Sequence, residues 1–347
     1  MKVLIVAPSS VVSMPELRLG VAEIKARGLQ VEVDPRVKKK DLFFAGSHVD
    51  RAQAFIDAAY REDVDVIWCA RGGYGANHLL SHLEAATLER GPPKKAKWLV
   101  GSSDATSLLQ FARVNWGFAA LHAPMPGLRK FALLSSAEKD SVFGWILGAR
   151  GAGLGQDRWP VFRRRLKWWG SPDQTVRGRM VGGNLTVWNT LLGTRFQPRH
   201  EEPAILFLED VTETLPRIDR AVRHLVDAGG LVGVRAIVLG NFLDCEDAVP
   251  TALQKLPSGA KVRESQLRNP PARWVRPLRR RVSQVQGLRR IFGAISRECG
   301  IPVAWGLPVG HGPEQFALPL GAEVEIGVSG TFELLPATMK HVGTARH

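Results

Sequence analysis

The chain has few of the features that mark secreted, membrane-spanning or metal-binding proteins. Its three cysteines, Cys69, Cys245 and Cys299, are widely separated and form neither a disulfide framework nor a metal-ligand spacing. It has no run of eighteen uncharged apolar residues, so no membrane-spanning helix is expected. The apolar start from Lys2 to Pro8 is too short for the core of a secretory signal and predicts a buried strand. Together these absences predict a cytoplasmic protein.

Loops that hold common cofactors are also missing. A dinucleotide site needs a G-x-G-x-x-G loop after a strand, but neither Pro8-Ser9-Ser10 nor the glycine-rich loop from Arg71 to Gly75 has this pattern. The lysine pattern of a phosphate-binding P-loop is absent as well. We therefore expect the protein to work without a cofactor and without a bound metal.

Positive charge is in excess. The chain has 47 Lys and Arg residues against 33 Asp and Glu, and much of the net charge of +14 lies in residues 163–169 and in a basic segment near 251–290. Arginine beside tryptophan can neutralise phosphates and stack bases. A solvated insertion, or a surface that attracts anionic substrates, has the same composition. Because no recognisable nucleic-acid-binding module is present, we do not expect a nucleic-acid partner.

The spacing of apolar residues predicts an α/β protein. A hydrophobic content of 45% over 347 residues is enough for the cores of two domains. In the first half, short apolar runs alternate with helical periodicity, which predicts a mostly parallel sheet with helices on both faces. Strands are expected at 2–8, 29–34, 64–70, 96–101 and 118–123, and helices at 15–27, 48–60, 76–84 and 105–114.

The pattern weakens after residue 125 and resumes near residue 180. We therefore expect an N-terminal α/β domain over 1–150, a linker over 151–179, and a smaller C-terminal α/β domain of the swivelling type over 180–335, with a basic insertion near 251–290. In the second domain the pattern predicts strands at 203–208, 236–240 and 302–306 and helices at 214–228 and 287–299.

The hexapeptide Gly101-Ser102-Ser103-Asp104-Ala105-Thr106 is the segment most suggestive of chemistry. It follows an expected strand and opens an expected helix, which is the layout of a nucleophile elbow. Such a turn exposes a hydroxyl at the carboxyl edge of the sheet, next to the N–H groups at the helix start. Either serine suits that role, and a simple helix N-cap is the alternative interpretation.

A serine nucleophile needs a base, and a histidine base works best when a carboxylate orients it. His311 follows an expected strand and is flanked by Gly310 and Gly312, so its ring can project into a cleft. Glu209 ends the apolar run Ile205-Leu206-Phe207-Leu208. A turn-capping histidine and a surface acid are the alternatives.

The glycine-rich loop from Arg71 to Gly75 follows the strand expected at 64–70. Glycines let the main chain approach a ligand closely and present N–H groups to a phosphate or to the oxyanion of an acyl-transfer intermediate. Because the phosphate-loop patterns are missing, the oxyanion interpretation is favoured. If the strands at 64–70 and 96–101 pair, this loop and the serine hexapeptide are neighbours.

Five segments in this order resemble the LD-carboxypeptidase family, serine peptidases that also include the microcin C immunity hydrolases. The resemblance spans residues 71–313 and rests on Arg71-Gly72-Gly73-Tyr74-Gly75-Ala76-Asn77, Gly101-Ser102-Ser103-Asp104-Ala105-Thr106, Gly182-Gly183-Asn184-Leu185, Leu206-Phe207-Leu208-Glu209-Asp210 and Gly306-Leu307-Pro308-Val309-Gly310-His311-Gly312-Pro313.

The resemblance implies roles for individual residues. It makes Ser103 the nucleophile, since the family pattern Gly-x-Ser-Asp places that serine third, and leaves Ser102 as a structural neighbour. His311 becomes the general base and then the acid, and Glu209 the residue that orients it. The remaining implied roles are oxyanion donors, the backbone N–H groups of Gly73 and Asp104, and candidate substrate contacts, Arg71 and Asn184.

The resemblance also implies a function. The expected reaction is hydrolysis of the amide before a C-terminal D-alanine of a peptidoglycan tetrapeptide, in cell-wall recycling, by a homodimer. An immunity-type hydrolase of peptidyl or aminoacyl nucleotides is the alternative, with Trp168 and Trp169 as candidates for stacking a base. A non-catalytic nucleic-acid-binding protein is the alternative from another class. The chain has His122-Ala123-Pro124 where the family commonly has His-Gly-Pro, so we expect the Ala123 methyl to reshape the cleft floor.

Overall fold

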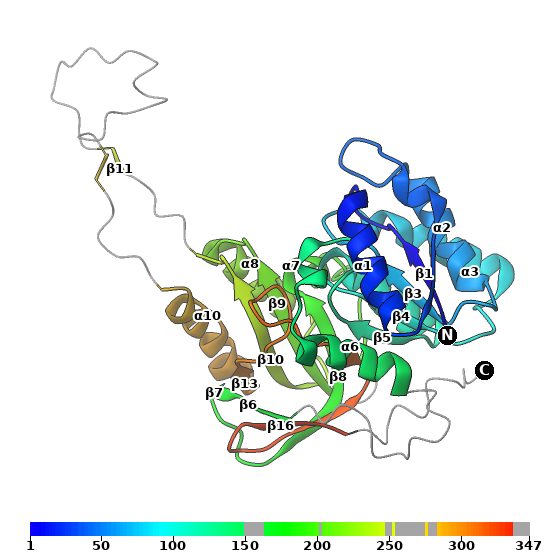
Figure 1. Cartoon of the computed structure of the whole chain (residues 1–347). Helices are drawn as coiled ribbons and strands as arrows, with labels where there is room; N and C mark the ends of the chain where they lie inside the picture. Colours follow the sequence, from blue (N-terminus) through cyan, green and yellow to red (C-terminus); the bar gives the residue numbers. More distant parts are fainter. Residues whose placement is uncertain (149–162, 201–202, 247–251, 254–274, 277–282, 336–347) are drawn as a thin grey trace, which may run out of the picture.

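Figure 1 shows the computed structural model of the chain. The structure describes residues 1–148, 163–200, 203–246, 252–253, 275–276 and 283–335. Residues 151–162 of the expected linker and most of the expected basic insertion near 251–290 lie outside the described residues. No helix in the described part of the chain combines the length and the apolar character needed to cross a membrane.

The N-terminal half forms a six-stranded sheet of order β14-β5-β4-β3-β1-β2. Its first five strands in sequence are parallel, which confirms the predicted mostly parallel sheet. They are β1 (Lys2–Val6), β2 (Gln30–Val33), β3 (Val66–Cys69), β4 (Trp98–Gly101) and β5 (Ala119–His122). The sixth strand, β14 (Leu318–Leu320), comes from far along the chain and pairs antiparallel to β5.

Helices cover both faces of this sheet (Figure 1). The α-helices are α1 (Met14–Ala26), α2 (His48–Tyr60), α3 (Leu80–Arg90), α4 (Thr106–Trp116), α5 (Arg129–Ala132) and α6 (Ser136–Gly148), and the short 3₁₀ turns are η1 (Pro35–Lys38), η2 (Ala76–Leu79) and η3 (Ser103–Ala105). Helix α2 begins with a capping box between Ser47 and Asp50, which satisfies backbone N–H groups that a helix start leaves free.

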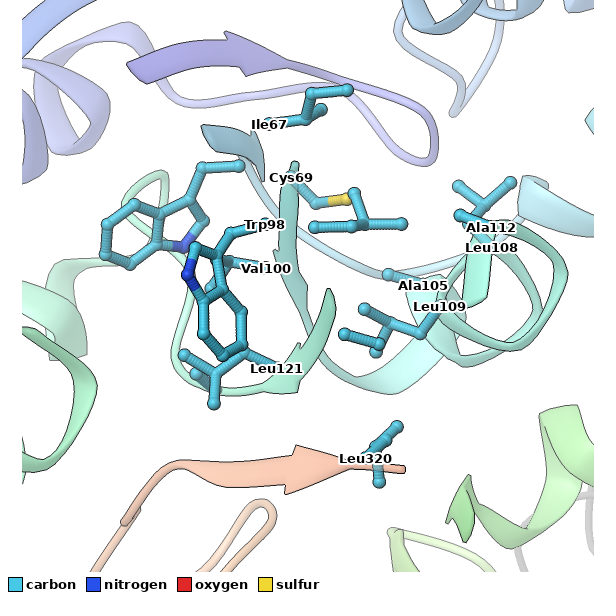
Figure 2. Packing of buried hydrophobic residues seen from close by; sticks show 14 of the residues in the cluster. Ile67, Cys69, Trp98, Val100, Ala105, Leu108, Leu109, Ala112, Leu121 and Leu320 are labelled. Atoms are coloured by element: carbon cyan, nitrogen blue, oxygen red, sulfur yellow. The ribbon is translucent and has the colours of Figure 1, made fainter. Parts of the chain in front are cut away.

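The buried contact between α4 and the sheet holds the start of α4 in place. Figure 2 shows Ala105, Leu108 and Leu109 on the side of the sheet to which Cys69 points. All four of these side chains are fully buried. A Cβ on Gly101 would lie 2.9 Å from the Cβ of Ala105, so the end of β4 has room only for glycine. The strand end and the helix start are therefore packed tightly against each other.

The C-terminal half forms an eight-stranded sheet of order β6-β16-β15-β8-β9-β10-β13-β7. Its four central strands are parallel, and antiparallel strands flank them. The central strands are β8 (Val176–Asn184), β9 (Ala204–Val211), β10 (Val234–Leu243) and β13 (Val303–Trp305), and the flanking strands are β6 (Arg163–Arg165), β7 (Lys167–Trp169), β15 (Glu323–Ile326) and β16 (Thr331–Leu335).

Helices α7 (Leu185–Asn189), α8 (Leu215–Asp227) and α10 (Gln284–Cys299) belong to this second half. A two-stranded ribbon of β11 (Ala252–Leu253) and β12 (Val275–Arg276) lies apart from both sheets. Helix α8 buries Leu215, Ile218, Val222 and Leu225 at helical spacing. The strands and helices predicted for this half are present, with β9 and β10 longer than predicted.

The segment expected as a linker contributes to the second sheet. Strands β6 and β7 and the start of β8 all fall within residues 151–179, and each pairs with a strand of that sheet. We therefore propose that the second domain begins before β6 rather than at residue 180. The sequence pattern did not predict these strands, because β6 and β7 have only three residues each and neither contains a long apolar run.

Candidate active site

Ser103 occupies a strained turn between β4 and α4. Its φ angle is +57°, in the left-handed region that non-glycine residues rarely adopt, whereas Ser102 is extended with φ −155°. Such a conformation costs on the order of 1–3 kcal/mol and persists only where the surroundings impose it. The backbone therefore distinguishes the two serines of the hexapeptide and singles out Ser103.

The glycine-rich loop packs directly on Ser103. A Cβ added to Gly72 would lie 2.9 Å from the Cβ of Ser103 and 3.1 Å from its Oγ. Gly73 has φ +111°, and a Cβ there would collide with the side chain of Ser10, whose Oγ accepts a hydrogen bond from the N–H of Tyr74 at 3.1 Å. The glycines thus allow the close approach that the sequence predicted between this loop and the serine turn.

Asp104 fastens the two loops together. Its side chain is buried, and its Oδ2 accepts a hydrogen bond from the N–H of Ala76 at 2.8 Å. Burial raises the pKa of Asp104, although Ser9, Ala76 and Arg51 favour its charged form. The carboxyl group of Asp104 therefore connects the serine turn to the residues after the glycine-rich loop. The backbone N–H of Asp104 is the group predicted to stabilise an oxyanion.

His311 and Glu209 are paired across the ends of two strands. Nδ1 of His311 lies 2.6 Å from Oε2 of Glu209, and the backbone N–H of His311 donates to the same oxygen at 3.3 Å. Gly310, with φ +106°, brings the loop so close that a Cβ on it would lie 2.6 Å from that oxygen. Glu209 ends the apolar part of β9 and is completely buried.

The contact between Glu209 and His311 shifts the pKa of both groups. Burial alone would raise the pKa of Glu209, but the charge and hydrogen bond of His311 hold it below its usual range. Burial alone would lower the pKa of His311, but the charge and hydrogen bond of Glu209 raise it above the ordinary value. Because Nδ1 faces Glu209, the other ring nitrogen, Nε2, is free to exchange a proton.

The side chain of Asn184 is hydrogen-bonded to Glu209 and Asp210 and does not project freely into the cleft. Its Nδ2 lies 3.4 Å from Oε1 of Glu209 and 3.0 Å from Oδ1 of Asp210, and its Oδ1 accepts from the N–H of Val187 at the start of α7. Its backbone N–H donates to Oγ1 of Thr106, the first residue of α4, at 3.0 Å. Although Asn184 reaches the cleft wall, the bonds of its side chain suit a positioning role better than the substrate contact predicted for it.

One cleft of about 650 Å³ collects most of the predicted site residues. Its lining includes Ser103, His311, Gly73, Asp104, Arg71 and Asn184. Glu209 lies behind His311 and does not line it. In the described part of the chain, Ser103 and His311 line the same cleft without a hydrogen bond between them, as catalytic pairs commonly do before substrate binds.

The cleft also contains side chains that the sequence did not single out. Asp210 accepts hydrogen bonds from the N–H and Oγ1 of Thr186, at 3.0 and 2.8 Å. Asn77, in η2 directly after the glycine-rich loop, donates to Oγ1 of Thr190 in the second half of the chain. Tyr74, exposed at the cleft, lies beside His78 with 3.5 Å between its hydroxyl and Nε2. Adjacency to Glu209 was the sequence signal for Asp210; nothing local marked the bond between Asn77 and Thr190.

Two expectations about neighbouring residues are corrected. Ala123 is buried, its N–H donates to the carbonyl of Gly101 at 2.9 Å, and it does not line the cleft, so its methyl does not form the cleft floor. Trp169 is buried and stacked on Trp305, with ring centroids 5.3 Å apart. Trp168 is partly buried against the core, 3.4 Å from the carbonyl of Gly327. Both indoles are used within the second sheet, and neither lines the cleft of Ser103.

Replacing Gly72 with alanine is expected to lower kcat on the order of 100-fold, because the new methyl would displace Ser103 or the loop that covers it. The kinetic constants of the variant check this, and Gly293→Ala in α10 is the control. There a Cβ meets nothing nearer than 3.5 Å, so activity should be unchanged. Full activity in Gly72→Ala would contradict the close packing of the loop on Ser103.

Fold and family comparison together define a two-domain serine peptidase. A family model described as the LD-carboxypeptidase N-terminal domain matches residues 3–123, and one described as the LD-carboxypeptidase C-terminal domain matches 177–269 and 271–326. The chain therefore belongs to the LD-carboxypeptidase family, as the resemblance of its motifs predicted, and it is a serine carboxypeptidase.

Individual relatives match more than two thirds of the chain, and two of them match nearly all of it. The murein tetrapeptide carboxypeptidase of Pseudomonas aeruginosa is 26% identical over 92% of this chain and 91% of its own. The crystal structure of muramoyltetrapeptide carboxypeptidase from Oxalobacter formigenes is similar with a TM-score of 0.69 and 25% identity, covering 96% and 98% of the two chains. The microcin C7 self-immunity protein MccF of Escherichia coli is 25% identical over 69% of this chain and 74% of its own.

Proposed function

We propose that the protein removes the C-terminal D-alanine of peptidoglycan-derived tetrapeptides, in cell-wall recycling, with a triad of Ser103, His311 and Glu209. The observation that carries the proposal is a strained serine in one cleft with a histidine that is held by a buried carboxylate at 2.6 Å. The named activity of the Pseudomonas relative supports the choice of substrate.

In the proposed reaction, Oγ of Ser103 attacks the carbonyl carbon of the amide before the D-residue. Nε2 of His311 accepts the hydroxyl proton, and Glu209 holds Nδ1–H and stabilises the imidazolium that forms. The N–H groups of Gly73 and Asp104 stabilise the oxyanion of the tetrahedral intermediate. His311 then gives the proton to the nitrogen of the leaving D-alanine, the C–N bond breaks, and water attacks the acyl-enzyme by the same proton route.

Arg71 is the one arginine among the described residues that line the cleft, and its charge suits a substrate with free carboxylates. Arg71 lines the cleft, and its Nη1 donates to the carbonyl of Val11 at 3.1 Å. Its Nε is buried and has no hydrogen-bond partner in the described part of the chain. We assign Arg71 to a substrate carboxylate, because an unpaired guanidinium N–H is costly unless a ligand satisfies it.

Replacing Arg71 with glutamine is expected to raise KM for the tetrapeptide about 10-fold to 100-fold while kcat changes little, the range for losing a charged hydrogen bond. Steady-state kinetics on the tetrapeptide measure this. Arg18→Gln, which removes the same charge from the exposed face of α1, is the control and should leave KM unchanged. A fall in kcat with an unchanged KM would count against a binding role for Arg71.

Hydrolysis of peptidyl or aminoacyl nucleotides remains the second candidate, because MccF is also a relative. The two are separated by incubating the purified protein with murein tetrapeptide and, in parallel, with an aminoacyl sulfamoyl adenylate. We expect release of D-alanine from the first and little free nucleotide from the second. The reverse result would favour the immunity-type reaction, and cleavage of neither would refute both. Family membership leaves no support for a non-catalytic nucleic-acid-binding protein.

The assembly and location of the enzyme are proposals on the same basis. We propose a cytoplasmic homodimer that works without a cofactor or metal. The described residues include no cluster of three or more His, Cys, Asp or Glu side chains that could hold a metal ion. Light scattering on the purified protein would test the dimer.

A further inference from the structure

A second cleft, separate from that of Ser103, lies between α4 and strand β8. Its volume is about 670 Å³, and none of its lining residues also lines the cleft of Ser103. One wall is α4, with Ser107, Gln110 and Phe111, and another is the segment that follows α7, including Phe196. The size is in the range of small-molecule sites.

Arginines dominate the charge of this second cleft. Arg113, Arg179, Arg195 and Arg199 line it, against Glu84 as the one carboxylate among the lining residues. Glu84 is paired with Arg195 at 2.8 Å, and Arg179 lies 3.5 Å from Glu323. The charges of Arg113 and Arg199 are therefore not balanced by Glu84, and the cleft is positive.

Arg113 is the central feature of the second cleft. Its Nη2 donates to Oε1 of Gln110 at 3.1 Å, and no carboxylate among the described residues pairs with it. Its stem passes Gly321, where a Cβ would lie 3.3 Å from Cδ of Arg113. Burial, with a smaller effect from Arg179, lowers the pKa of Arg113 to about 10, which leaves it charged at neutral pH. Arg113 is partly exposed and lines the cleft, so a ligand there can reach its guanidinium. A partly desolvated guanidinium without a counter-charge is costly, and an anion would offset that cost.

His200, which also lines the second cleft, has a buried polar atom without a partner. Its Nε2 is buried and has no hydrogen-bond partner in the described part of the chain. Burial, then the charge of Arg113, lowers its pKa to about 4, so the ring is neutral at pH 7. Its ring lies parallel to that of Trp188, with centroids 6.4 Å apart. A neutral imidazole can donate one hydrogen bond to an anion without adding charge.

We propose that this cleft binds a small organic anion through a phosphate or carboxylate group placed on Arg113, with His200 as a further donor. The forked guanidinium matches both groups. The rings of Phe111 and Phe196, with centroids 6.1 Å apart, provide an apolar wall for the rest of the molecule. The site is independent of the reaction proposed for Ser103.

Calorimetry on the full chain tests this with three probes: phenyl phosphate, benzoate and inorganic phosphate. We expect phenyl phosphate or benzoate to bind with a Kd below about 1 mM and more tightly than inorganic phosphate, and the better of the two identifies the preferred group. Arg113→Gln should weaken binding at least tenfold, and Arg18→Gln should not change it. The Ser103→Ala protein should bind as wild type does.

Three outcomes would overturn the proposal: no binding of either organic probe at millimolar concentration, equal binding by Arg113→Gln, or displacement of the probe by a peptide that occupies the cleft of Ser103. If Arg113→Gln fails to fold, as judged by circular dichroism, His200→Ala takes its place. That variant keeps the charge and removes one donor, so at least threefold weaker binding is expected, and unchanged binding would count against the site.

Discussion

Replacing Ser103 with alanine is expected to lower kcat for tetrapeptide hydrolysis by about 10⁴-fold to 10⁶-fold, the range for loss of the nucleophile in serine peptidases. The loss should be in kcat, because Ser103 forms a bond to substrate only during the reaction. Release of D-alanine, measured at saturating substrate, gives the value. Relief of the positive φ is not expected, since alanine is strained at +57° in the same way.

Ser102→Ala is the matched control for this substitution. Ser102 is the adjacent residue of the same type, but it is extended and stands at the N-cap of η3 without a side-chain capping bond. Its replacement should change kcat by less than about tenfold. If Ser102→Ala abolished activity and Ser103→Ala did not, the nucleophile would be the other serine and the assignment would be wrong.

Replacing Glu209 with glutamine is expected to lower kcat/KM by about 10³-fold to 10⁴-fold, as when the orienting acid of a triad becomes an amide. The amide of glutamine can donate to Nδ1 of His311, which would leave the proton on Nε2 and block acceptance of the serine proton. Glutamine has nearly the volume of glutamate, so the substitution removes the charge without opening a cavity. The charge that is lost belongs to a buried carboxylate that contacts Nδ1 of His311 at 2.6 Å.

The pH profile distinguishes this role from a merely structural one. Burial by itself lowers the pKa of His311, but the contact with Glu209 outweighs this effect and raises the pKa above its ordinary value. Loss of the Glu209 charge should therefore lower the pKa of His311. The acidic limb of kcat/KM, which reports the free enzyme's essential base, should therefore move to lower pH in Glu209→Gln. Glu213→Gln is the control, because Glu213 lines the same cleft but is bonded to Thr214 and Arg217 instead of to His311. An unshifted limb in Glu209→Gln would contradict the pairing.

The elements that sequence predicted well are those with a local signal. The apolar runs of β1 to β5 alternate with the periodic helices α1 to α4, and each pattern depends on residues close together in the chain. The serine turn was predicted for the same reason, as was its closeness to the glycine-rich loop, since β3 and β4 are neighbouring parallel strands. Glycine at positions 72 and 73 is explained only by what lies opposite it, the side chains of Ser103 and Ser10.

The elements that sequence did not predict depend on distant partners. Strand β14 joins the N-terminal sheet from residue 318, and its central residue is a proline, which is tolerated on an edge strand. The short strand β7 was expected within a linker, but it pairs with β13, where Trp169 and Trp305 stack. No local pattern separates such segments from a connection.

The site shows the same division between local and distant information. The sequence by itself determined the residue types of the site, the strand ends at which they lie and the family. Motifs and apolar periodicity depend on residues that are close together in the chain, so they can be recognised without the fold. Only the tertiary structure decided that Asn184 is bonded to Glu209 and Asp210, that Ala123 does not line the cleft of Ser103, and that Arg113 lines a second cleft. Those outcomes depend on which side chains the packing of two sheets brings within hydrogen-bonding distance, and residues far apart in the chain supply both partners.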